Sequence, residues 1–585
     1  MKKIIYTIFA ASVLALTSCV DYFLQKPQGN DLTENDIFTS REQTLSAIAQ
    51  AYQNALCMNL PYNDWATGTI SLISGEINAR KFLWETYNLV QRSGMSATGN
   101  TIDDYGRNFT AIRTCYLVHD NIDMMPESEM SAQEKSYVKG EMLTLVAYRY
   151  CRMFIQYGGV PVVDGLVDPG NSRIARAPLA DVLGHIVKLC DNAFALLPDV
   201  WEDNFKGRIT KAVPLAIKAQ ALLYAARPLF NSEQPYLSMT DPSKNDRICF
   251  GNYSVDRWEE AYQAALDVIE YSEAHGFEII DTGSPLDDYG TAVSVPNNRE
   301  VLLFYKHQHV AAPTGNGNFF YPRQQSGGAN GMSLYQIKQY YTVDGGDVVW
   351  PEPGDTWLPF SDFQAKVESL EPRYWASAAP AGYAAKNNPD DYYWTPAGGL
   401  TWASTWENTA QNEACGRRVK FWYKAGNRDW FDFPVYRLAY FYLAAAEAAN
   451  EAGHNEESLR YLNRIRERAG FTTEISETDR TVLRGIIQRE WAVEFYDENH
   501  RLFDVKHWKL PDIGNGIIGG TKYVTEFQYV NGTYGTDPST YSGYKVAAVY
   551  DGYWAVNQYL NPFPTDEVAK GYLGAAPANG QNPGY

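Results

Sequence analysis

The chain has 585 residues and a formal net charge of −19, because 69 acidic residues outnumber 50 basic ones. Nucleic-acid phosphates attract a basic surface, so this excess of acid excludes a nucleic-acid-binding protein. Aromatic residues make up 14% of the chain, with 42 Tyr and 15 Trp, which is more than a core needs and favours rings that stack on a ligand.

The amino terminus has the features of an export signal. Lys2 and Lys3 precede an apolar stretch from Ile4 to Leu16, which is too short to span a bilayer. No later apolar run approaches 18 residues, so the sequence predicts no membrane-spanning helix.

The signal ends in the letters LTSC, which resemble a bacterial lipobox whose cysteine is acylated before cleavage. We expect residues 1–18 to be a signal peptide and Cys19 to carry the acyl chains that anchor the protein. The polar residues 19–35 then form a tether. The alternative is an ordinary secreted protein with a coincidental cysteine.

Apolar residues recur with a helical period through much of the chain. Between residues 133 and 157 they follow a 3,4 spacing, and the alanines of 211–228 let neighbouring helices approach closely. Pro178 and Pro198 bound another such segment. The predicted helices cover about 41–57, 108–124, 133–157, 178–198, 211–228, 256–274, 436–452, 455–469 and 479–498. Antiparallel pairs of such helices are typical of tetratricopeptide-like units, so the sequence predicts a mainly α scaffold of about four units.

The composition changes between about 276 and 434, where Gly, Pro, Asn and Trp are frequent and 8 of the 15 tryptophans lie. Residues 301–305 resemble a short strand, and no long helix is evident. We predict one domain from 36 to 585. Its parts are a helical scaffold (about 36–275 and 435–510), a loop-rich lobe with a few short strands (about 276–434) and an irregular C-terminal segment (511–585).

Cysteine and histidine give no sign of a metal site. None of the cysteines has the spacing of metal ligands, and Cys151 and Cys190 lie in apolar helical segments where buried free thiols are expected. His307 and His309 share one face of the predicted strand, but no third ligand is recognisable. We therefore predict no metal and no cofactor.

Four stretches resemble the SusD/RagB family of Bacteroidetes outer-membrane lipoproteins, in the same order along nearly the whole mature chain. They are GEMLTLVAYRYCRMFIQYGGVPVVD (140–164), TKAVPLAIKAQALLYAARPLFN (210–231), the run from FPVYRLAYFYLAAAEAAN (433–450) to IIQREWAVEFYDENHRLFDVKHW (486–508), and YLNPFPTDEV (559–568).

This resemblance implies a tetratricopeptide-like scaffold with an irregular lobe packed against it. It also implies a lipid-anchored protein at the outer face of the outer membrane. Such a protein binds a nutrient, most often a glycan, and hands it to a partner TonB-dependent (SusC-like) transporter. A tether suits this task because it raises the concentration of captured ligand near the transporter.

The motifs that carry the resemblance are mostly architectural. The charged residues Arg489, Glu490, Arg501 and Asp504 lie within one of them. We expect these side chains to pair inside the helical core, where buried pairs fix geometry more than they add stability.

A glycan site needs flat aromatic faces that stack on the C–H faces of sugar rings, with polar groups that bond the hydroxyls. The candidates are aromatic residues in loops with polar neighbours, at positions that match the family's contact loops by location only. They are Asp64, Trp65, Trp84, Tyr87, Phe319, Phe320, Tyr321, Arg373, Tyr393 and Trp394. The alternative role for each is to pack the lobe.

The sequence therefore predicts a binder of oligosaccharide or polysaccharide that performs no catalysis. The alternatives are a binder of peptides or other nutrients, a glycoside-cleaving enzyme and a purely structural lid for the transporter. A glycosidase needs two carboxylates, which 69 acidic residues could supply. However, neither a GxSxG nucleophile elbow nor an HExxH zinc signature occurs in the sequence.

Overall fold

The computed structural model describes residues 34–56, 70–78, 86–99, 101–168, 170, 173–308, 331–383, 386, 415–422, 430–530, 537–574 and 580–585. The predicted signal peptide, Cys19 and the tether up to residue 33 lie outside these ranges. Within them, no helix combines the length and the apolar character that crossing a membrane requires.

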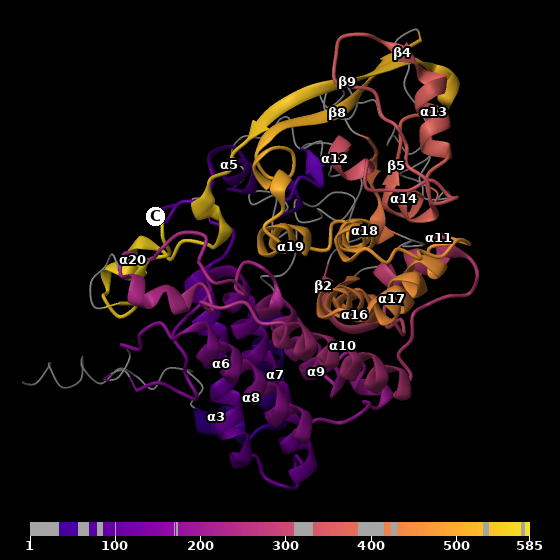
Figure 1. Ribbon diagram of the computed structural model, residues 1–585. Helices are drawn as coiled ribbons and strands as arrows, with labels where there is room; N and C mark the ends of the chain where they lie inside the picture. The colour runs from indigo at the N-terminus through magenta and orange to yellow at the C-terminus, as the bar shows by residue number, and fades with distance from the viewer. Residues whose placement is uncertain are drawn as a thin grey trace, which may run out of the picture.

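Helices dominate the structure, as the sequence predicts (Figure 1). Each predicted helix is present, with ends shifted by a few residues. The long helices are α4 (Arg41–Leu56), α6 (Tyr105–Asn121), α7 (Ala132–Tyr157), α8 (Leu179–Leu196), α9 (Ala212–Ala226), α10 (Asp256–Ala274), α16 (Leu438–Ala452), α17 (Asn455–Arg468) and α18 (Arg480–Glu494). Short helices not predicted are α3 (Glu34–Phe38), α5 (Thr86–Ser93), α11 (Pro285–Ser294), α12 (Leu334–Ile337), α13 (Phe360–Glu368), α14 (Pro372–Ser377), α19 (Arg501–His507) and α20 (Thr565–Ala569).

The long helices pack in pairs along the chain. Helix α7 packs against α8, α9 against α10, and α16 against α17, while contacts of α8 with α9 and of α10 with α16 join the pairs into one stack. Figure 1 shows this stack in the lower half of the molecule, with α18 and α19 above α16. The arrangement agrees with the predicted tetratricopeptide-like scaffold.

Helix α7 is buried along most of its length. Ser131 and Glu134 form a capping box at its start, and it ends before Gly158, whose φ of 78° favours glycine. Its partner α8 approaches so closely that a Cβ at Gly140 would lie 2.8 Å from the Leu197 side chain. The free thiol of Cys151 is buried here, as is that of Cys190 on α8, which confirms both predictions.

The strands form three small antiparallel groups. Strand β2 (Val301–Gln308), predicted in part, pairs with β7 (Trp430–Arg437). Strand β9 (Tyr541–Gly552) lies between β8 (Gly520–Tyr529) and β4 (Leu358–Pro359). The remaining group has the order β1-β3-β6-β5, from Ile77–Asn78, Gly331–Met332, Arg417–Arg418 and Ala378–Ala379.

The C-terminal segment differs from the irregular structure that the sequence predicts. It contains β8 and β9, which are longer than any other described strand. The hairpin shares a core with the lobe: Phe360 at the start of α13 stacks on Tyr541, with ring centroids 4.7 Å apart, and Phe363 contacts Phe527. Figure 1 shows the hairpin at the top of the molecule beside α13. Thus the lobe is completed by residues far along the chain.

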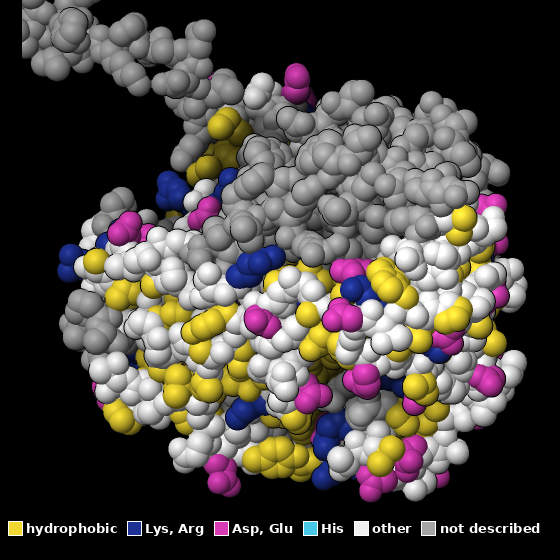
Figure 2. Space-filling view, turned by 90° about the horizontal axis from the view of Figure 1, so that it is seen from above, with side chains coloured by type: hydrophobic (Ala, Val, Ile, Leu, Met, Phe, Trp, Pro, Cys, Tyr) yellow, Lys and Arg dark blue, Asp and Glu magenta, His cyan; other side chains and the backbone are white. Residues whose placement is uncertain are grey.

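The surface seen from above carries interspersed charges. Acidic, basic and apolar side chains alternate over the part of this face that is described, without a basic patch of the kind that nucleic acids require (Figure 2). This distribution agrees with the excess of acidic residues in the composition.

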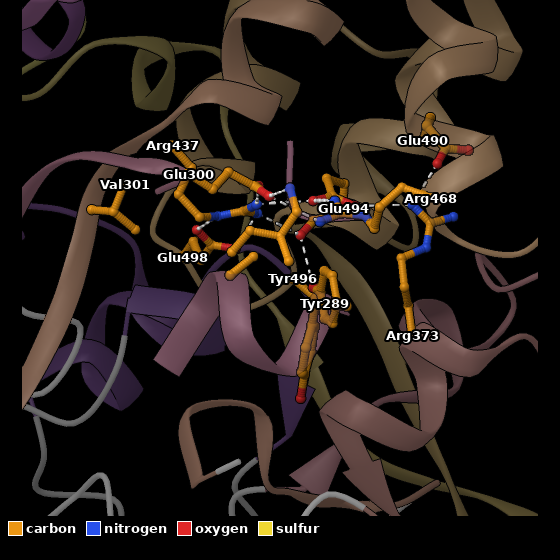
Figure 3. A network of polar contacts seen from close by, with 12 residues as sticks. Tyr289, Glu300, Val301, Arg373, Arg437, Arg468, Glu490, Glu494, Tyr496 and Glu498 are labelled. Atoms are coloured by element: carbon orange, nitrogen blue, oxygen red, sulfur yellow. Dashed lines mark hydrogen bonds and ion pairs between the residues drawn. The ribbon is translucent and has the colours of Figure 1, made fainter. Parts of the chain in front are cut away.

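A buried ion-pair network joins the lobe to the helical scaffold (Figure 3). Its five acidic and five basic side chains come from α14, α17, α18, β7 and the segments beside them, and none is more than 3% exposed. The members are Glu300, Glu371, Glu490, Glu494, Glu498, Arg373, Lys420, Arg437, Arg466 and Arg468.

Glu494 lies at the centre of this network. Its carboxylate accepts hydrogen bonds from Arg373 Nη1 (3.1 Å), Arg437 Nη1 (3.0 Å) and Arg468 Nη2 (2.5 Å). Burial by itself would raise the pKa of Glu494, but the arginines lower it well below its ordinary value. Conversely, burial would lower the pKa of Arg437, and its carboxylate partners raise it. Each charge therefore stabilises the ionised form of its partners, and loss of one charge leaves its partners buried and uncompensated.

Replacing Arg437 tests how much the fold depends on this compensation. We expect Arg437→Met to lower the free energy of unfolding by about 3 to 5 kcal/mol, because Glu300 and Glu498 lose their shared partner. Urea unfolding measures this loss.

The matched control is Arg299→Met. Arg299 pairs with Glu278 at 3.1 Å, but these side chains are 70% and 58% exposed, so the same substitution should cost less than about 1 kcal/mol. Equal losses in the two variants would contradict the role of the buried network.

Candidate functional site

A groove between the helical scaffold and the lobe is the candidate site. It has a cavity volume of about 760 Å³, within the size range of ligand pockets. Its walls come from one face of α4, the turn at residues 204–208 and residues 304–306 of β2.

The sequence explains how these walls form. Apolar positions 45, 48, 52 and 56 follow a helical period along α4 and place one face of that helix on the groove. On the opposite side, Gly207 has a φ of 98°, and a Cβ there would lie 2.6 Å from the ring of Phe304. Glycine thus lets the turn pack directly on β2.

A buried carboxylate fixes the polar part of the wall. Glu141 of α7 accepts hydrogen bonds from Tyr52 Oη (2.6 Å) and from Arg208 Nε (2.8 Å). The Tyr52 hydroxyl in turn accepts from the Ile209 N–H at 2.9 Å. Burial raises the pKa of Glu141, although the bonds from Arg208 oppose this shift. Burial also raises the pKa of Tyr52 well above its ordinary value, so the phenol stays protonated and keeps donating.

The arginine is also held by aromatic rings. Its guanidinium carbon lies 4.1 Å from the centre of the Trp201 ring and 5.3 Å from that of Phe205. Because its charge is paired with Glu141 and its guanidinium packs on two rings, Arg208 is a rigid part of the wall.

The groove presents aromatic and polar groups together. Phe205, Phe304 and Tyr305 supply ring surface, and Gln53 and Asn204 supply amide groups. No acidic side chain occurs among its described lining residues, although acidic residues outnumber basic ones in the chain as a whole. The arrangement can stack on a ligand ring and hydrogen-bond its hydroxyls.

Two of the predicted contact regions adjoin this groove in the chain. Helix α4 ends at Leu56, a lining residue, and residues 57–69 with Asp64 and Trp65 follow it directly. Strand β2 likewise leads into residues 309–330, which contain Phe319, Phe320 and Tyr321. These five candidates lie outside the described residues, so their contact with a ligand stays a prediction.

The same holds for three further candidates, because Trp84, Tyr393 and Trp394 also lie outside the described residues. Tyr87 belongs to α5, but the position of its side chain is not described. His307 lies in β2 with an undescribed side chain, and His309 lies outside the described part. Among the described residues, no group of three His, Cys, Asp or Glu side chains could hold a metal ion.

Arg373 is the one candidate whose side chain is described, and it does not reach the surface. Its exposed fraction is 0%, and it donates to Glu371 (2.7 Å), Glu490 (2.5 Å) and Glu494 (3.1 Å) inside the ion-pair network. A side chain without exposed surface cannot contact a ligand in an open site. We therefore assign Arg373 to the network rather than to ligand binding.

The expected pairing of charged residues in the helical core is confirmed for two of the four residues, Glu490 and Asp504. Glu490 and Asp504 each form a buried ion pair with an arginine, at 2.5 Å and 2.6 Å. Arg501 is 4% exposed and donates to the hydroxyl of Tyr335. Arg489 pairs with an exposed aspartate nearer the surface.

The groove residues themselves were not predicted from the sequence. Tyr52 lies on a helix and Phe304 in a strand, and aromatic residues at such positions usually belong to the core. One signal was present in NFKGR (204–208), where glycine follows an aromatic residue among basic and amide side chains, as in an exposed turn.

A short segment before the predicted contact residues Trp84 and Tyr87 is tied firmly to the scaffold. Glu76 accepts hydrogen bonds from the Asp497 N–H (2.8 Å) and from Ser74 Oγ (2.5 Å), and Ser71 Oγ donates to Asp497 Oδ1 (2.7 Å). Burial raises the pKa of Glu76 to about 7, although the bonds from Ser74 and Asp497 lower it.

Comparisons with known proteins agree with this architecture. A family model described as "SusD family" matches residues 298–585, and one described as "Starch-binding associating with outer membrane" matches residues 23–223. The search of curated proteins found no match.

Solved structures resemble the chain over nearly its full length. A SusD-like protein from Bacteroides fragilis is 21% identical, with 94% of this chain and 98% of that chain covered and a TM-score of 0.69. A SusD-like carbohydrate-binding protein from the same species is 16% identical, with 91% and 98% covered and a TM-score of 0.64. A putative sugar-binding protein from Bacteroides vulgatus is 17% identical, with 94% and 99% covered and a TM-score of 0.58. At these identities the likeness establishes the fold.

The raised pKa of Glu76 predicts a pH-dependent stability. Because the ordinary pKa of a glutamate is 4.5 and that of folded Glu76 is about 7, the folded protein binds the extra proton between these values. The contribution of Glu76 is thus fully present below about pH 4.5 and is lost as the pH rises through about 7. It amounts to at most about 3 kcal/mol.

Glu76→Gln should remove this part of the pH dependence. Free energies of unfolding in urea at about pH 5 and about pH 8 measure it, with Glu278→Gln, at an exposed glutamate, as the control. A pH dependence that is the same in Glu76→Gln as in the parent protein would refute the assignment.

Proposed function

Because this chain belongs to the SusD/RagB family, we propose that it is a cell-surface lipoprotein that binds oligosaccharides and delivers them to a TonB-dependent transporter of the outer membrane. Binding is reversible and the glycan is not cleaved. The observation that carries this proposal is the groove between α4, residues 204–208 and β2, with its aromatic and amide lining.

The chemistry of the groove suits a glycan chain. Phe205 and Phe304 offer ring faces for the C–H faces of sugars, and Gln53 and Asn204 offer both donors and acceptors for hydroxyls. The ion pair of Glu141 with Arg208 keeps the wall in place without the ligand, so little ordering cost falls on binding. The predicted contact residues at 64–65 and 319–321 extend this surface in our proposal.

The described lining supports the proposal that the glycan is bound without cleavage. A glycosidase places two carboxylates about 5 to 10 Å apart around the scissile bond. The described groove residues include no carboxylate, and Glu141 behind them is bonded to Tyr52 and Arg208. The described lining thus offers surfaces that can hold a glycan and no pair of carboxylates that could hydrolyse it.

The family and the amino-terminal sequence support the proposed membrane anchor and partner. Acyl chains on Cys19 would hold the protein to the outer membrane, and residues 19–33 would let the body reach the mouth of a transporter. An anchored binder raises the local concentration of ligand at that mouth.

Filling the groove tests the proposed site. Ala49 is exposed on α4 and lines the groove, so Ala49→Trp should obstruct it and weaken oligosaccharide binding at least about tenfold. Titration calorimetry against a glycan panel measures the affinity, and chromatography of the same mixtures detects cleavage products.

Gln50→Trp is the control, since Gln50 is exposed on the same helix and is not a lining residue. Both variants should keep the parent's thermal stability. Equal affinities of the two variants would remove the groove from the proposal, and cleaved products would assign the protein to the enzymes.

Replacing the lipidated residue tests the anchor. In Cys19→Ala the acyl chains have no attachment point, so the protein should leave the outer-membrane fraction and take up no labelled fatty acid. The parent protein, extracted in mild detergent under inducing conditions, should co-purify with a TonB-dependent barrel. A variant that still fractionates with the membrane would contradict the anchor, and repeated recovery of the parent alone would contradict the partner.

A further inference from the structure

A second cavity lies within the helical scaffold, apart from the groove. Its volume is about 350 Å³, and it shares no described lining residue with the groove. Helices α16 and α18 form one side, and Trp258 of α10 and Trp508 beyond α19 form the other. In Figure 1, α18 and α19 lie above α16, and α10 lies below it.

The charges that line this cavity are balanced. Arg484 binds Glu451 with two hydrogen bonds, from Nε (2.5 Å) and Nη2 (2.7 Å). Glu447 is held in the same way by Arg227 behind the wall, at 2.9 Å and 2.8 Å. The lining has two arginines and two glutamates in all. The formal charges of the lining therefore sum to zero, so the cavity as a whole favours a neutral ligand.

Several polar groups nevertheless face no partner in the described protein. Asn450 is only 2% exposed; its Nδ2 donates to the Arg480 carbonyl (3.0 Å), but its Oδ1 accepts no hydrogen bond from a described residue. The side-chain amide of Gln488 forms no hydrogen bond with any described residue either, and the same is true of the Tyr253 hydroxyl. Together these groups offer both donors and acceptors. Hydroxyl groups satisfy both kinds.

Aromatic rings supply the remaining surface. The indole of Trp508 is fixed by a 2.7 Å hydrogen bond from Nε1 to Glu447. Trp258 is 3% exposed inside the cavity, while Tyr253 is 55% exposed at its edge. Rings and hydroxyl-bonding groups in the same lining fit a flat molecule with C–H faces and a hydroxylated rim.

We propose that this cavity is a second binding site, which takes one neutral sugar ring, either a free monosaccharide or the end of a chain. Asn450 and Gln488 bond its hydroxyls, and Tyr253 covers its face. The site is independent of the groove, because the two cavities have separate walls.

The test uses protein whose groove is already obstructed by Ala49→Trp, so that only the cavity is measured. Saturation-transfer NMR with methyl glycosides of neutral hexoses and pentoses should still detect binding in this background. Adding Gln488→Leu and Tyr253→Ala should raise the dissociation constant at least about tenfold. Neither side chain bonds a described protein group, so the unfolding midpoint should not move.

Gln528→Leu in the same background is the matched control, because Gln528 is exposed on β8 and lines neither cavity. It should bind the methyl glycosides as the background does. The proposal is overturned if the background protein gives no saturation transfer, if Gln488→Leu with Tyr253→Ala leaves the affinity unchanged, or if a uronate binds more tightly than its neutral counterpart. The groove is tested separately, by comparing the oligosaccharide affinity of the parent protein with that of Ala49→Trp.

Discussion

Glu494 binds three guanidinium groups from three separate elements, and none of these side chains is more than 1% exposed. Arg373 comes from the lobe, Arg437 from the strand that leads into α16, and Arg468 from α17. Because each charge is compensated only when the others are in place, the lobe and the helical stack have one relative position. A hydrophobic contact alone would tolerate sliding, whereas a network with directional hydrogen bonds does not.

That fixed position matters for binding, because the groove is assembled from both parts. Its scaffold wall is α4, held through the bonds of Tyr52 and Arg208 to Glu141, and its other wall is β2, whose first residue follows Glu300 of the network. The walls exist before a ligand arrives, which spares the cost of ordering them. The same rigid helices also enclose the second cavity, where Asn450 is left with an unused acceptor. A protein built in this way can vary its loops while its scaffold stays unchanged.

The sequence predicted the long helices well, because their apolar residues repeat with a period that only a helix satisfies. It did not predict the β8–β9 hairpin, since the core facing that hairpin is built from Phe360 and Phe363, far away in the chain. The same reason explains Arg373: sequence shows an arginine in a loop-rich region, but its partners Glu490 and Glu494 are more than 110 residues away. The pairing of Glu490 and Asp504 was recognised because their motif resembles the family. Groove residues such as Phe304 were not predicted, because an aromatic residue in a strand usually belongs to the core.

The central claim is that the groove binds glycan on a preformed surface. Hydrogen–deuterium exchange of the parent protein, with and without an oligosaccharide that it binds, tests this most directly. We predict slower exchange in α4, at residues 204–208 and at residues 304–306 when the glycan is present, with unchanged exchange in α17 and α18 around the ion-pair network. Protection that appears only elsewhere, or a loss of protection around Glu494 on binding, would contradict the account.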